Sequence, residues 1–377
     1  MPCAIISSLG TSLLTNFATN GVKKIVHLTA NSKSGEIQKE QIRIIEELRI
    51  KVESRLKESK PQVFRKYSAE LNGIYGYYEV SGLKDESLER DVHFLIASDT
   101  YQGQLTGKLI MNHLKCTGFK HVEIITPEGF NTKNTKNFKN GVSKIVKWCE
   151  STVSPYRESR YHIVFNLVGG FKSLQGYLNT LGMFYADEII YIFDGVGSDL
   201  IRIPRLPVKM DEFPVLREQA VLFALMEHGY FACKNEVQGI PELMLEDDGD
   251  CYTLDPVGLL LWERNKVEIL GSSELLSFPG LLMQDSFSKD FNSVKENKKK
   301  AVIQNDLAKA SLLFKEKGLA GLRSDGGFLY ETYKNVKGNV GHFRLDQDWR
   351  ISCLPDGDIL RLRHVGNHDY VNNMETR

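Results

Sequence analysis

The first 205 residues alternate short apolar runs with longer amphipathic stretches, and this alternation constrains the fold more than any other feature of the sequence. Short runs rich in Val, Ile, Phe and Leu predict strands, and apolar residues at helical spacing between them predict helices. Strand and helix in alternation predict a doubly wound, Rossmann-like α/β fold with a parallel sheet, whose ligands bind beyond the carboxyl ends of the strands. The predicted strands are Ala4–Ser8, Lys24–Thr29, Val92–Ala97, His121–Thr126, His162–Val168 and Glu188–Phe193, and the predicted helices are Ile37–Leu56, Gly103–Leu114, Asn137–Trp148 and Leu174–Tyr185.

The remainder of the chain divides into two further predicted parts. Residues 206–284 predict a small connecting module of helix and hairpin, similar to a degenerate winged helix, with an acidic turn at Asp247–Asp250. Residues 285–377 predict an α+β domain with an antiparallel sheet, because alternating runs flank an Asp-Gly turn at 355–358. Two helices, Lys289–Lys299 and Val302–Lys317, are predicted to precede this sheet. The predicted domains are therefore 1–205, 206–284 and 285–377.

The composition is that of an ordinary globular chain. The 48 Lys and Arg residues balance the 48 Asp and Glu residues, so net charge alone indicates no nucleic-acid partner. Six cysteines without zinc spacing favour reduced thiols over disulfides or a metal site. No apolar run approaches the roughly 18 to 20 residues that span a bilayer, and the first residues lack a basic segment. We therefore expect a cytoplasmic protein with no membrane partner and no metal.

Three loops follow predicted strands at the edge of the sheet where ligands bind. Small and hydroxyl residues open a helix after each loop and offer N–H and O–H groups to an anion. Because GxGxxG and GxxxxGK[ST] are both absent, NAD binding and ordinary ATP hydrolysis are disfavoured. Each loop alone is typical of a helix cap, whereas the three together predict a phosphate-bearing ligand. The candidate ligand contacts are Gly10, Thr11, Ser12, Asp99, Thr100, Gly169, Gly170, Phe171, Lys172 and Ser173.

Three segments of this part occur in an order that resembles a known family. They are SLGTSLLTN, SDTYQGQLTGKL and NLVGGFKSLQGYLNTLGMFYADEIIYIF, and together they resemble the CRISPR-associated Rossmann fold (CARF) domain of type III CRISPR effectors over residues 1–205. The resemblance implies a homodimer that binds a cyclic oligoadenylate, most often the tetra-adenylate, as an allosteric activator on its two-fold axis. It implies contacts from Gly10, Thr11 and Ser12 and from residues 169–173. In an isologous dimer each loop and each Lys172 would meet the ligand twice.

The last part of the chain is rich in groups that suit RNA cleavage without a metal. When the ribose 2′-OH is the nucleophile, the protein supplies a base, an acid and cations around the phosphate. Period-two geometry predicts His342 with Arg344 on one strand face, and Arg361 with Arg363 on another. Metal catalysis is disfavoured because the aspartates here lie in predicted turns. For any single residue, the alternative is a solvated face of an antiparallel sheet.

Residues 285–373 also resemble a known family, the RelE toxins. The likeness rests on two helices followed by KGNVGHFRLDQDWRISCLPDGDILRLRHVGNHDYV. It implies a ribosome-dependent mRNA endonuclease in which Arg350 is the transition-state cation and Tyr370 the terminal tyrosine. Members commonly carry a lysine pair where this chain has His342 and Arg344, so the base stays open between His342 and His368. The candidate catalytic residues are Lys337, His342, Arg344, Arg350, Arg361, Arg363, His368 and Tyr370.

Two other functions fit parts of the sequence. Arg363 and His368 satisfy R-x4-H, the signature of HEPN ribonucleases that cut free RNA, but this motif belongs on a helix and here follows a β-patterned run. A transcriptional regulator would bind DNA through the middle module, but the acidic hairpin tip would repel phosphate. The sequence favours an mRNA endonuclease activated by cyclic oligoadenylate. Its expected partners are a second copy, the ligand, and mRNA on the ribosome, and DNA is not expected.

Overall fold

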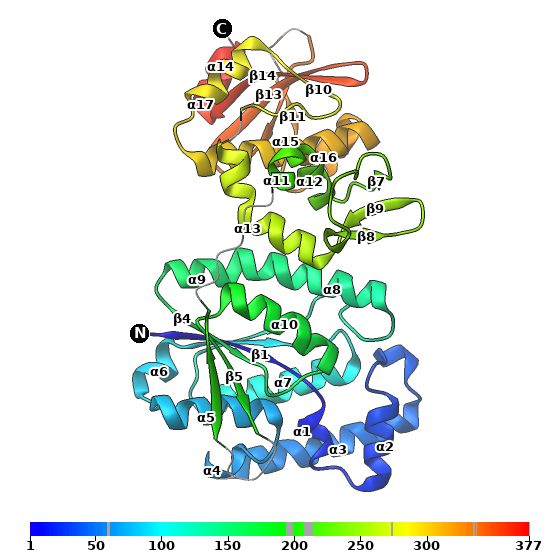
Figure 1. Ribbon diagram of the computed structural model, residues 1–377, viewed down its shortest axis with the longest axis vertical. Helices are drawn as coiled ribbons and strands as arrows, with labels where there is room; N and C mark the ends of the chain where they lie inside the picture. Colours follow the sequence, from blue (N-terminus) through cyan, green and yellow to red (C-terminus); the bar gives the residue numbers. More distant parts are fainter. Residues whose placement is uncertain are drawn as a thin grey trace. The chain divides into compact units, whose positions relative to one another are not determined.

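The computed structural model describes residues 1–58, 61–193, 199–206, 214–272, 274–334, 336 and 338–376. The chain divides into two compact units, Met1–Lys209 and Met210–Arg377 (Figure 1). The helices of the predicted middle module belong to the second unit, where α13 (Pro256–Ser272) packs against α15 (Asn297–Lys317). No helix among the described residues is both long enough and apolar enough to cross a membrane.

A six-stranded sheet forms the centre of the first unit, in the order β3-β2-β1-β4-β5-β6 (Figure 1). The first five strands pair in parallel, and β6 pairs antiparallel with β5. The parallel strands match five of the predicted runs to within a residue or two at their ends, so the predicted parallel sheet is confirmed, whereas β6 was not predicted. The strands are β1 (Cys3–Ser8), β2 (Val92–Ile96), β3 (His121–Ile125), β4 (His162–Asn166), β5 (Glu188–Ile192) and β6 (Leu200–Pro204).

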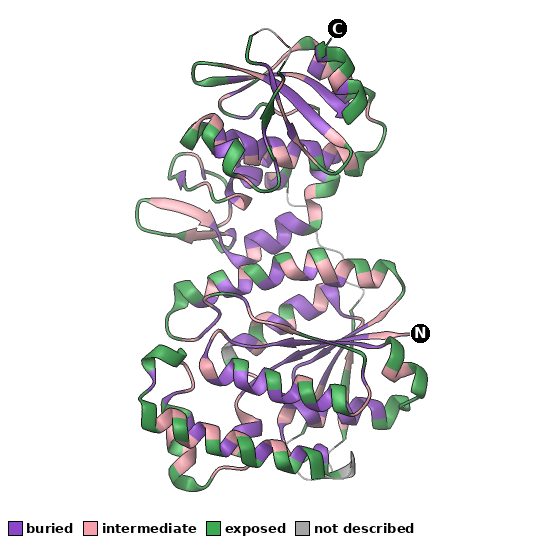
Figure 2. Cartoon of the chain, turned by 180° about the vertical axis from the view of Figure 1, so that it is seen from behind, coloured by how far each residue is buried: buried purple, intermediate pink, exposed green. Residues whose placement is uncertain are grey.

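Helices cover both faces of this sheet, as its buried strands require (Figure 2). Helices α3, α5 and α7 bury their apolar residues with Ile5, Leu95 and Val164 in one core. On the other face, Phe94 contacts Trp148 of α8, and a Cβ on Gly182 of α10 would lie 2.6 Å from Ile189. The helices are α1 (Ser12–Thr15), α2 (Asn20–Leu28), α3 (Lys39–Glu58), α4 (Pro61–Phe64), α5 (Ala69–Ser81), α6 (Asp85–Arg90), α7 (Tyr101–Cys116), α8 (Thr135–Trp148), α9 (Ser154–Glu158) and α10 (Lys172–Tyr185).

The predicted strand Lys24–Thr29 is wrong, because this segment belongs to helix α2. Its apolar side chains Val22, Ile25 and Val26 recur at helical spacing, and Val26 is the one that α2 buries fully. Leu28, which a central strand would bury, is 73% exposed. A surface helix that buries one stripe explains this pattern better than a strand buried on both faces.

The second unit begins with helices and a small antiparallel sheet. The sheet has the order β7-β9-β8, and its acidic hairpin turn confirms the turn predicted at 247–250. Gly249 in this turn has a φ of 94°, a conformation that favours glycine. The elements are α11 (Pro214–Glu218), α12 (Ala220–Glu227), α13 (Pro256–Ser272), β7 (Ala232–Cys233), β8 (Leu245–Asp247) and β9 (Cys251–Leu254).

A five-stranded sheet, in the order β10-β14-β13-β12-β11, completes the second unit. It is antiparallel except for β10, which pairs in parallel with β14. The chain is thus a mixed α/β protein with one largely parallel sheet and two separate, mainly antiparallel sheets. The elements are β10 (Leu281–Met283), α14 (Asp285–Ser293), α15 (Asn297–Lys317), α16 (Leu319–Ser324), β11 (Glu331–Thr332), β12 (Gly341–Arg344), β13 (Trp349–Asp356), β14 (Ile359–Asn367) and α17 (His368–Thr376).

Two predictions in this region need correction. The predicted helix Lys289–Lys299 is interrupted, because α14 ends at Ser293 and α15 begins at Asn297. The strict alternation along the last strand is also broken: pairing shifts between Ser352 and Cys353, which leaves Arg363 opposite no residue of β13. A β-bulge of this kind re-aims the side chains that follow it.

Candidate functional site

The loops after β1 and β4 meet where the strand order reverses. β2 and β3 lie on one side of β1, whereas β4 and β5 lie on the other, so the two loops leave neighbouring parallel strands. A Cβ on Gly10 would lie 3.1 Å from the backbone nitrogen of Gly170. Gly170 has a φ of 101°, and a Cβ there would lie 3.1 Å from the Cβ of Ser8. The structure therefore brings together two of the three predicted loops through their glycines.

A buried carboxylate binds donors of the β1 loop. Glu70, in the first turn of α5, is 0% exposed. Its Oε1 accepts a hydrogen bond from the Gly10 N–H at 2.7 Å, and its Oε2 accepts one from the Ser12 hydroxyl at 2.7 Å. A Cβ on Gly169 would lie 2.4 Å from Oε1. These glycines thus make room for a carboxylate of the protein itself, at donors that the sequence assigned to an anionic ligand.

Further buried hydrogen bonds hold the same two loops. The Ser8 hydroxyl donates to the Gly169 carbonyl at 2.5 Å. The Asn166 side-chain amide donates to the Ser7 hydroxyl and to the Glu70 carbonyl, both at 3.1 Å. Ser7, Ser8 and Asn166 are fully buried, and a buried hydrogen-bond network of this kind is costly to break. The loops are therefore fixed from beneath by strand and helix residues.

The third predicted loop has partners within the protein. The Thr100 side chain accepts the Gly103 N–H at 3.1 Å and caps α7. Asp99 accepts the Gly129 N–H at 2.9 Å and contacts the Lys33 ammonium at 2.9 Å. Burial alone would raise the pKa of Asp99, but the Lys33 and Gly129 hydrogen bonds outweigh it and hold the pKa below its ordinary value. Asp99 and Thr100 thus tie the loop and cap the helix.

The β4 loop presents a cation at its end. Lys172 begins α10 and is exposed, and it makes no ion pair with any residue that the structure describes. Phe171 precedes it at the N-cap position without a side-chain capping bond. Ser173 lies in the first helical turn, and its side chain is outside the described residues. Thr11 likewise precedes α1 without a side-chain capping bond.

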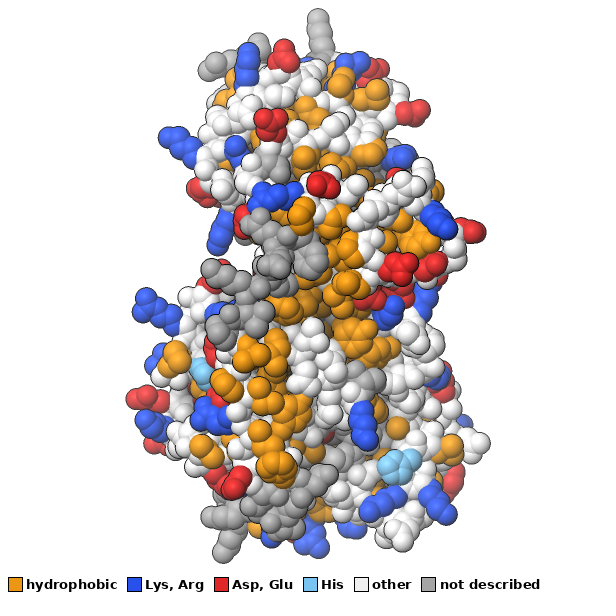
Figure 3. All heavy atoms as spheres, in the orientation of Figure 1, with side chains coloured by type: hydrophobic (Ala, Val, Ile, Leu, Met, Phe, Trp, Pro, Cys, Tyr) orange, Lys and Arg blue, Asp and Glu red, His pale blue; other side chains and the backbone are white. Residues whose placement is uncertain are grey.

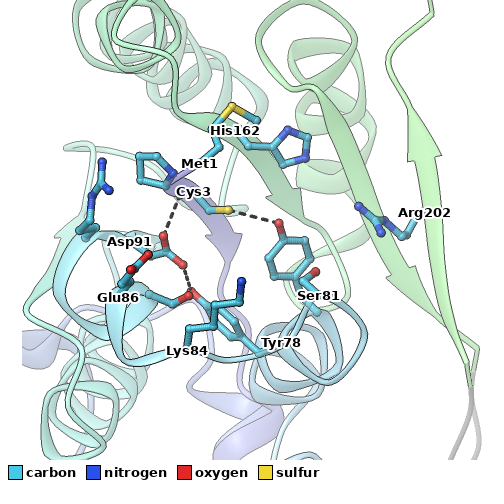
Figure 4. Close-up of a pocket in the computed structure, with 14 residues that line it drawn as sticks. Met1, Cys3, Tyr78, Ser81, Lys84, Glu86, Asp91, His162 and Arg202 are labelled. Atoms are coloured by element: carbon cyan, nitrogen blue, oxygen red, sulfur yellow. Dashed lines mark hydrogen bonds between the residues drawn. The ribbon is translucent and has the colours of Figure 1, made fainter.

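A cavity of about 430 Å³ lies at the opposite edge of the sheet, beside the amino ends of β1 and β4 (Figure 4). The Cys3 N–H donates to Asp91 at 2.8 Å, and the Cys3 sulfur lies 3.3 Å from the Tyr77 hydroxyl. Burial raises the pKa of the Cys3 thiol, so the thiolate is disfavoured. This cavity is separate from the predicted loops, and its thiol is not activated as a nucleophile.

In the second unit, two rows of polar side chains share one face of the five-stranded sheet. His342, Ser352 and His364 pair in register across β12, β13 and β14, and Arg344 pairs with Arg350. Directly paired residues of antiparallel strands point to the same face. The bulge brings His364 to this face, although strict alternation places it with Leu360 and Leu362. The face therefore carries two histidines and two arginines.

His342 is half-buried in this cluster and lacks a complete set of partners. Its ring lies 4.8 Å from that of Tyr333, and its buried Nδ1 has no hydrogen-bond partner in the described part of the chain. Burial lowers the pKa of His342, Glu331 opposes this, and the charges of Arg350, His368 and Arg344 lower it further. The neutral imidazole, which can accept a proton, is thus favoured near neutral pH.

Arg350 is 5% exposed although it is charged. Its Nη1 donates to the carbonyls of Asp346 and Trp349, both at 2.8 Å. Its buried Nε has no partner among the residues described. Burial lowers the pKa of Arg350, and the neighbouring Arg344 adds to this. A guanidinium keeps its charge in proteins, so Arg350 is a buried cation with an unfilled donor.

The other predicted catalytic residues are engaged in local pairs. Arg361 bonds Asp356 across the end of the β13–β14 hairpin. Arg363 donates to both oxygens of Glu375, at 2.9 and 3.0 Å. His368, half exposed at the start of α17, lies 3.1 Å from Asp369. His368 lies close enough to His342 to affect its pKa, and Arg363 shares Glu375 with Ser352 of the cluster, whereas Arg361 lies at the end of the hairpin. Lys337 lies outside the described residues.

Tyr370 contacts Asp290, a residue that the sequence analysis did not identify. Its hydroxyl donates to Asp290 of α14 at 2.5 Å, and burial with the Asp290 charge raises the pKa of Tyr370 to about 12. Asp290 also contacts His364 Nδ1 at 2.9 Å. Glu375, also missed, is wholly buried and accepts the Ser352 hydroxyl at 2.6 Å. Both acids come from helices, where an isolated carboxylate carries no sequence signal of its contacts.

Among the residues described, no group of three or more His, Cys, Asp or Glu side chains is placed to hold a metal ion. The polar face of the second unit instead carries two arginines, two histidines and the Ser352 hydroxyl. Such a face can bind a phosphate and move protons.

Comparison with known proteins finds a match to one family model. Residues 65–206 match the model described as CRISPR-associated protein (Cas_APE2256). A copper-bound mutant toxin from Helicobacter pylori is similar at 20% identity over 25% of this chain and 99% of the toxin, but its TM-score of 0.20 carries no argument. No curated protein matches the chain. The family match, which lies within the first unit, supports a CRISPR-associated protein.

Proposed function

We propose that this chain is an endoribonuclease of CRISPR defence, activated by a cyclic oligoadenylate bound to the first unit and cleaving mRNA on the ribosome with the second. The match of residues 65–206 to a CRISPR-associated family supports the setting. The resemblances to CARF domains and RelE toxins supply the ligand and the substrate. The cluster on the five-stranded sheet supplies the chemistry.

One observation carries the proposal: two buried nitrogens of this cluster, His342 Nδ1 and Arg350 Nε, have no hydrogen-bond partner in the described structure. Buried polar atoms without partners are costly and rare in native proteins, and a catalytic role or a bound ligand is one explanation for them. Both belong to side chains that a phosphodiester could engage. Arg344, paired with Arg350 across the strands, adds a second cation on the same face.

The proposed reaction needs no group beyond these side chains and the RNA. His342 takes the proton of a ribose 2′-OH, and the 2′ oxygen attacks the adjacent phosphorus. The bond from phosphorus to the 5′ oxygen breaks, and that oxygen takes a proton from the acid. The products are a 2′,3′-cyclic phosphate and a 5′-OH. Arg350 stabilises the charge that develops on the phosphate, and His368 is the candidate acid.

The regulatory half of the proposal rests on the β1 and β4 loops and on a second copy of the chain. A ligand with two-fold symmetry suits an isologous dimer, which presents each Lys172 twice. Two exposed apolar residues near the edge strand β6 could contact a second copy: Phe193, which follows β5, is 66% exposed, and Leu206, which follows β6, is 53% exposed. Figure 3 shows hydrophobic side chains gathered over this edge of the sheet. For activation, the ligand must bind the active arrangement more tightly than the inactive one.

The structure disfavours the HEPN alternative. Arg363 lies in β14 and is bonded to Glu375, whereas His368 begins α17. The two residues of R-x4-H therefore do not share a helix.

Analysis of the RNA ends tests the proposed function. Purified protein is added to a translating extract with and without cyclic tetra-adenylate, and the cut ends are chemically typed. We expect ligand-dependent cuts with 2′,3′-cyclic phosphate and 5′-OH ends, and none with Arg350→Ala. Ends that carry a 5′-phosphate, or equal cutting by Arg350→Ala, would overturn the assignment of this site.

A further inference from the structure

Helix α5 holds the Glu70 carboxylate in a fixed position against the β1 loop. The Ser12 oxygen accepts the Ala69 N–H at 3.0 Å, so its own proton points to Glu70 Oε2. The Gly10 N–H donates to Oε1. Both carboxylate oxygens therefore accept hydrogen bonds, which is the arrangement of an ionised carboxylate.

Among the residues that the structure describes, no lysine or arginine forms an ion pair with Glu70. The hydrogen bonds described for its carboxylate come from Gly10 and Ser12, which are both neutral donors. Lys33 is engaged with Asp99. Lys172 is the exposed cation that the β4 loop presents, within the described residues. A phosphate at these loops therefore meets one lysine and one buried carboxylate from each chain.

We propose that Glu70 is a specificity-determining residue that makes these loops select phosphodiesters over phosphomonoesters. The inference rests on the proposed function. A phosphodiester carries one negative charge, whereas a phosphomonoester carries up to two near neutral pH. The extra charge is repelled by Glu70, and the buried position of Glu70 limits screening by salt. A ring of diesters is accepted, and the opened ring that ends in a monoester is rejected.

Three ligands and three proteins test this proposal by titration calorimetry. The ligands are cyclic tetra-adenylate, linear tetra-adenylate ending in a phosphate monoester, and the same linear chain with that phosphate blocked as its methyl ester. The last two differ in charge at one phosphate. The proteins are the wild type, Glu70→Gln and the control Glu79→Gln. Glu79 lies on the same helix α5, is exposed and pairs with Arg65, so it controls for net charge.

We expect the wild type to bind the methyl ester about tenfold more tightly than the monoester, from one unit of charge at a partly buried site. Glu70→Gln should reduce this ratio to about threefold or less by strengthening monoester binding, and Glu79→Gln should leave it unchanged. An unchanged ratio in folded Glu70→Gln would overturn the inference.

If Glu70→Gln does not fold, the wild type alone tests the inference. Equal affinity for the two linear ligands overturns the inference, and a preference for the methyl ester supports it. If the wild type binds the cyclic ligand but binds the linear monoester and its methyl ester equally, only this inference fails. If it binds none of the three, the proposed function fails and the inference fails with it.

Discussion

Replacing Glu375 with alanine should loosen helix α17 from the sheet that carries the proposed active site. Glu375 is the buried acceptor for two groups of that sheet, the Ser352 hydroxyl at 2.6 Å and the Arg363 guanidinium at 2.9 and 3.0 Å. Its side chain is 0% exposed, and that of Arg363 is 31% exposed. Since α17 also holds His368, both stability and cleavage should depend on this contact.

The magnitude follows from what the substitution leaves behind. Ser352 is fully buried, and leaving its hydroxyl proton without an acceptor costs about 1–3 kcal/mol. Arg363 can turn partly to water, so the lost ion pair adds no more than about 1 kcal/mol. We expect a loss of about 2–3 kcal/mol in the free energy that holds α17 on the sheet. At 2 kcal/mol, local opening becomes about 30-fold more frequent.

Hydrogen exchange measured by mass spectrometry on the full chain resolves this segment. Peptides that cover 368–376 should exchange about 30-fold faster in Glu375→Ala, while peptides of the first unit are unchanged. Glu375→Gln keeps an acceptor for Ser352 and should show a smaller effect. Glu316→Ala, at the exposed end of α15, is the matched control. Exchange in 368–376 that stays within about twofold of wild type, less than 0.5 kcal/mol, would refute this reasoning.

Further predictions concern the two proposed sites. Arg350→Ala should abolish RNA cleavage but leave the ligand-induced rise in Tm, measured by differential scanning fluorimetry, unchanged; loss of both effects would count against separate sites. Lys172→Ala should weaken ligand binding about tenfold or more and raise the ligand concentration needed for cleavage, with full response to ligand as the contrary result. Burial is the main cause that lowers the pKa of His342 below the ordinary histidine value of 6.5. The imidazole therefore stays neutral, and able to accept a proton, at pH values somewhat below 6.5. Activity should therefore fall with decreasing pH only below 6.5, in a profile of kcat/KM against pH. Arg344→Gln removes a charge that lowers this pKa, so the acid limb should move to higher pH; an unmoved limb would argue against His342 as the base.

The parallel sheet was predictable because its strands are apolar on both faces and lie between amphipathic helices. The pattern failed at Lys24–Thr29, where a short apolar stripe on a surface helix looks like a strand. Strand β6 was missed because an edge strand buries little, and Arg202 and Pro204 within it are exposed. Tertiary packing determines the secondary structure of such segments, and the local spacing of apolar residues does not reveal that packing.

The candidate sites, too, could be predicted from the sequence only in part. The glycine loops and the basic strands were predictable from residue types at strand ends and in alternating runs. The partners Glu70, Asp290 and Glu375 were not, since each is a single helical acid whose contact lies far away in sequence. The bulge at Arg363 was also hidden, because alternation gives no sign of an extra residue in one strand.

The central claim is that ligand binding in one unit controls cleavage by the other. The most direct measurement is the rate at which purified full-length protein cuts an mRNA under translation, with cyclic tri-, tetra- or hexa-adenylate or with none. The account predicts that one of these rings increases the rate by at least about a hundredfold, which corresponds to a decrease of about 2.7 kcal/mol in the activation free energy of cleavage. A rate that is the same with and without every ring would contradict it.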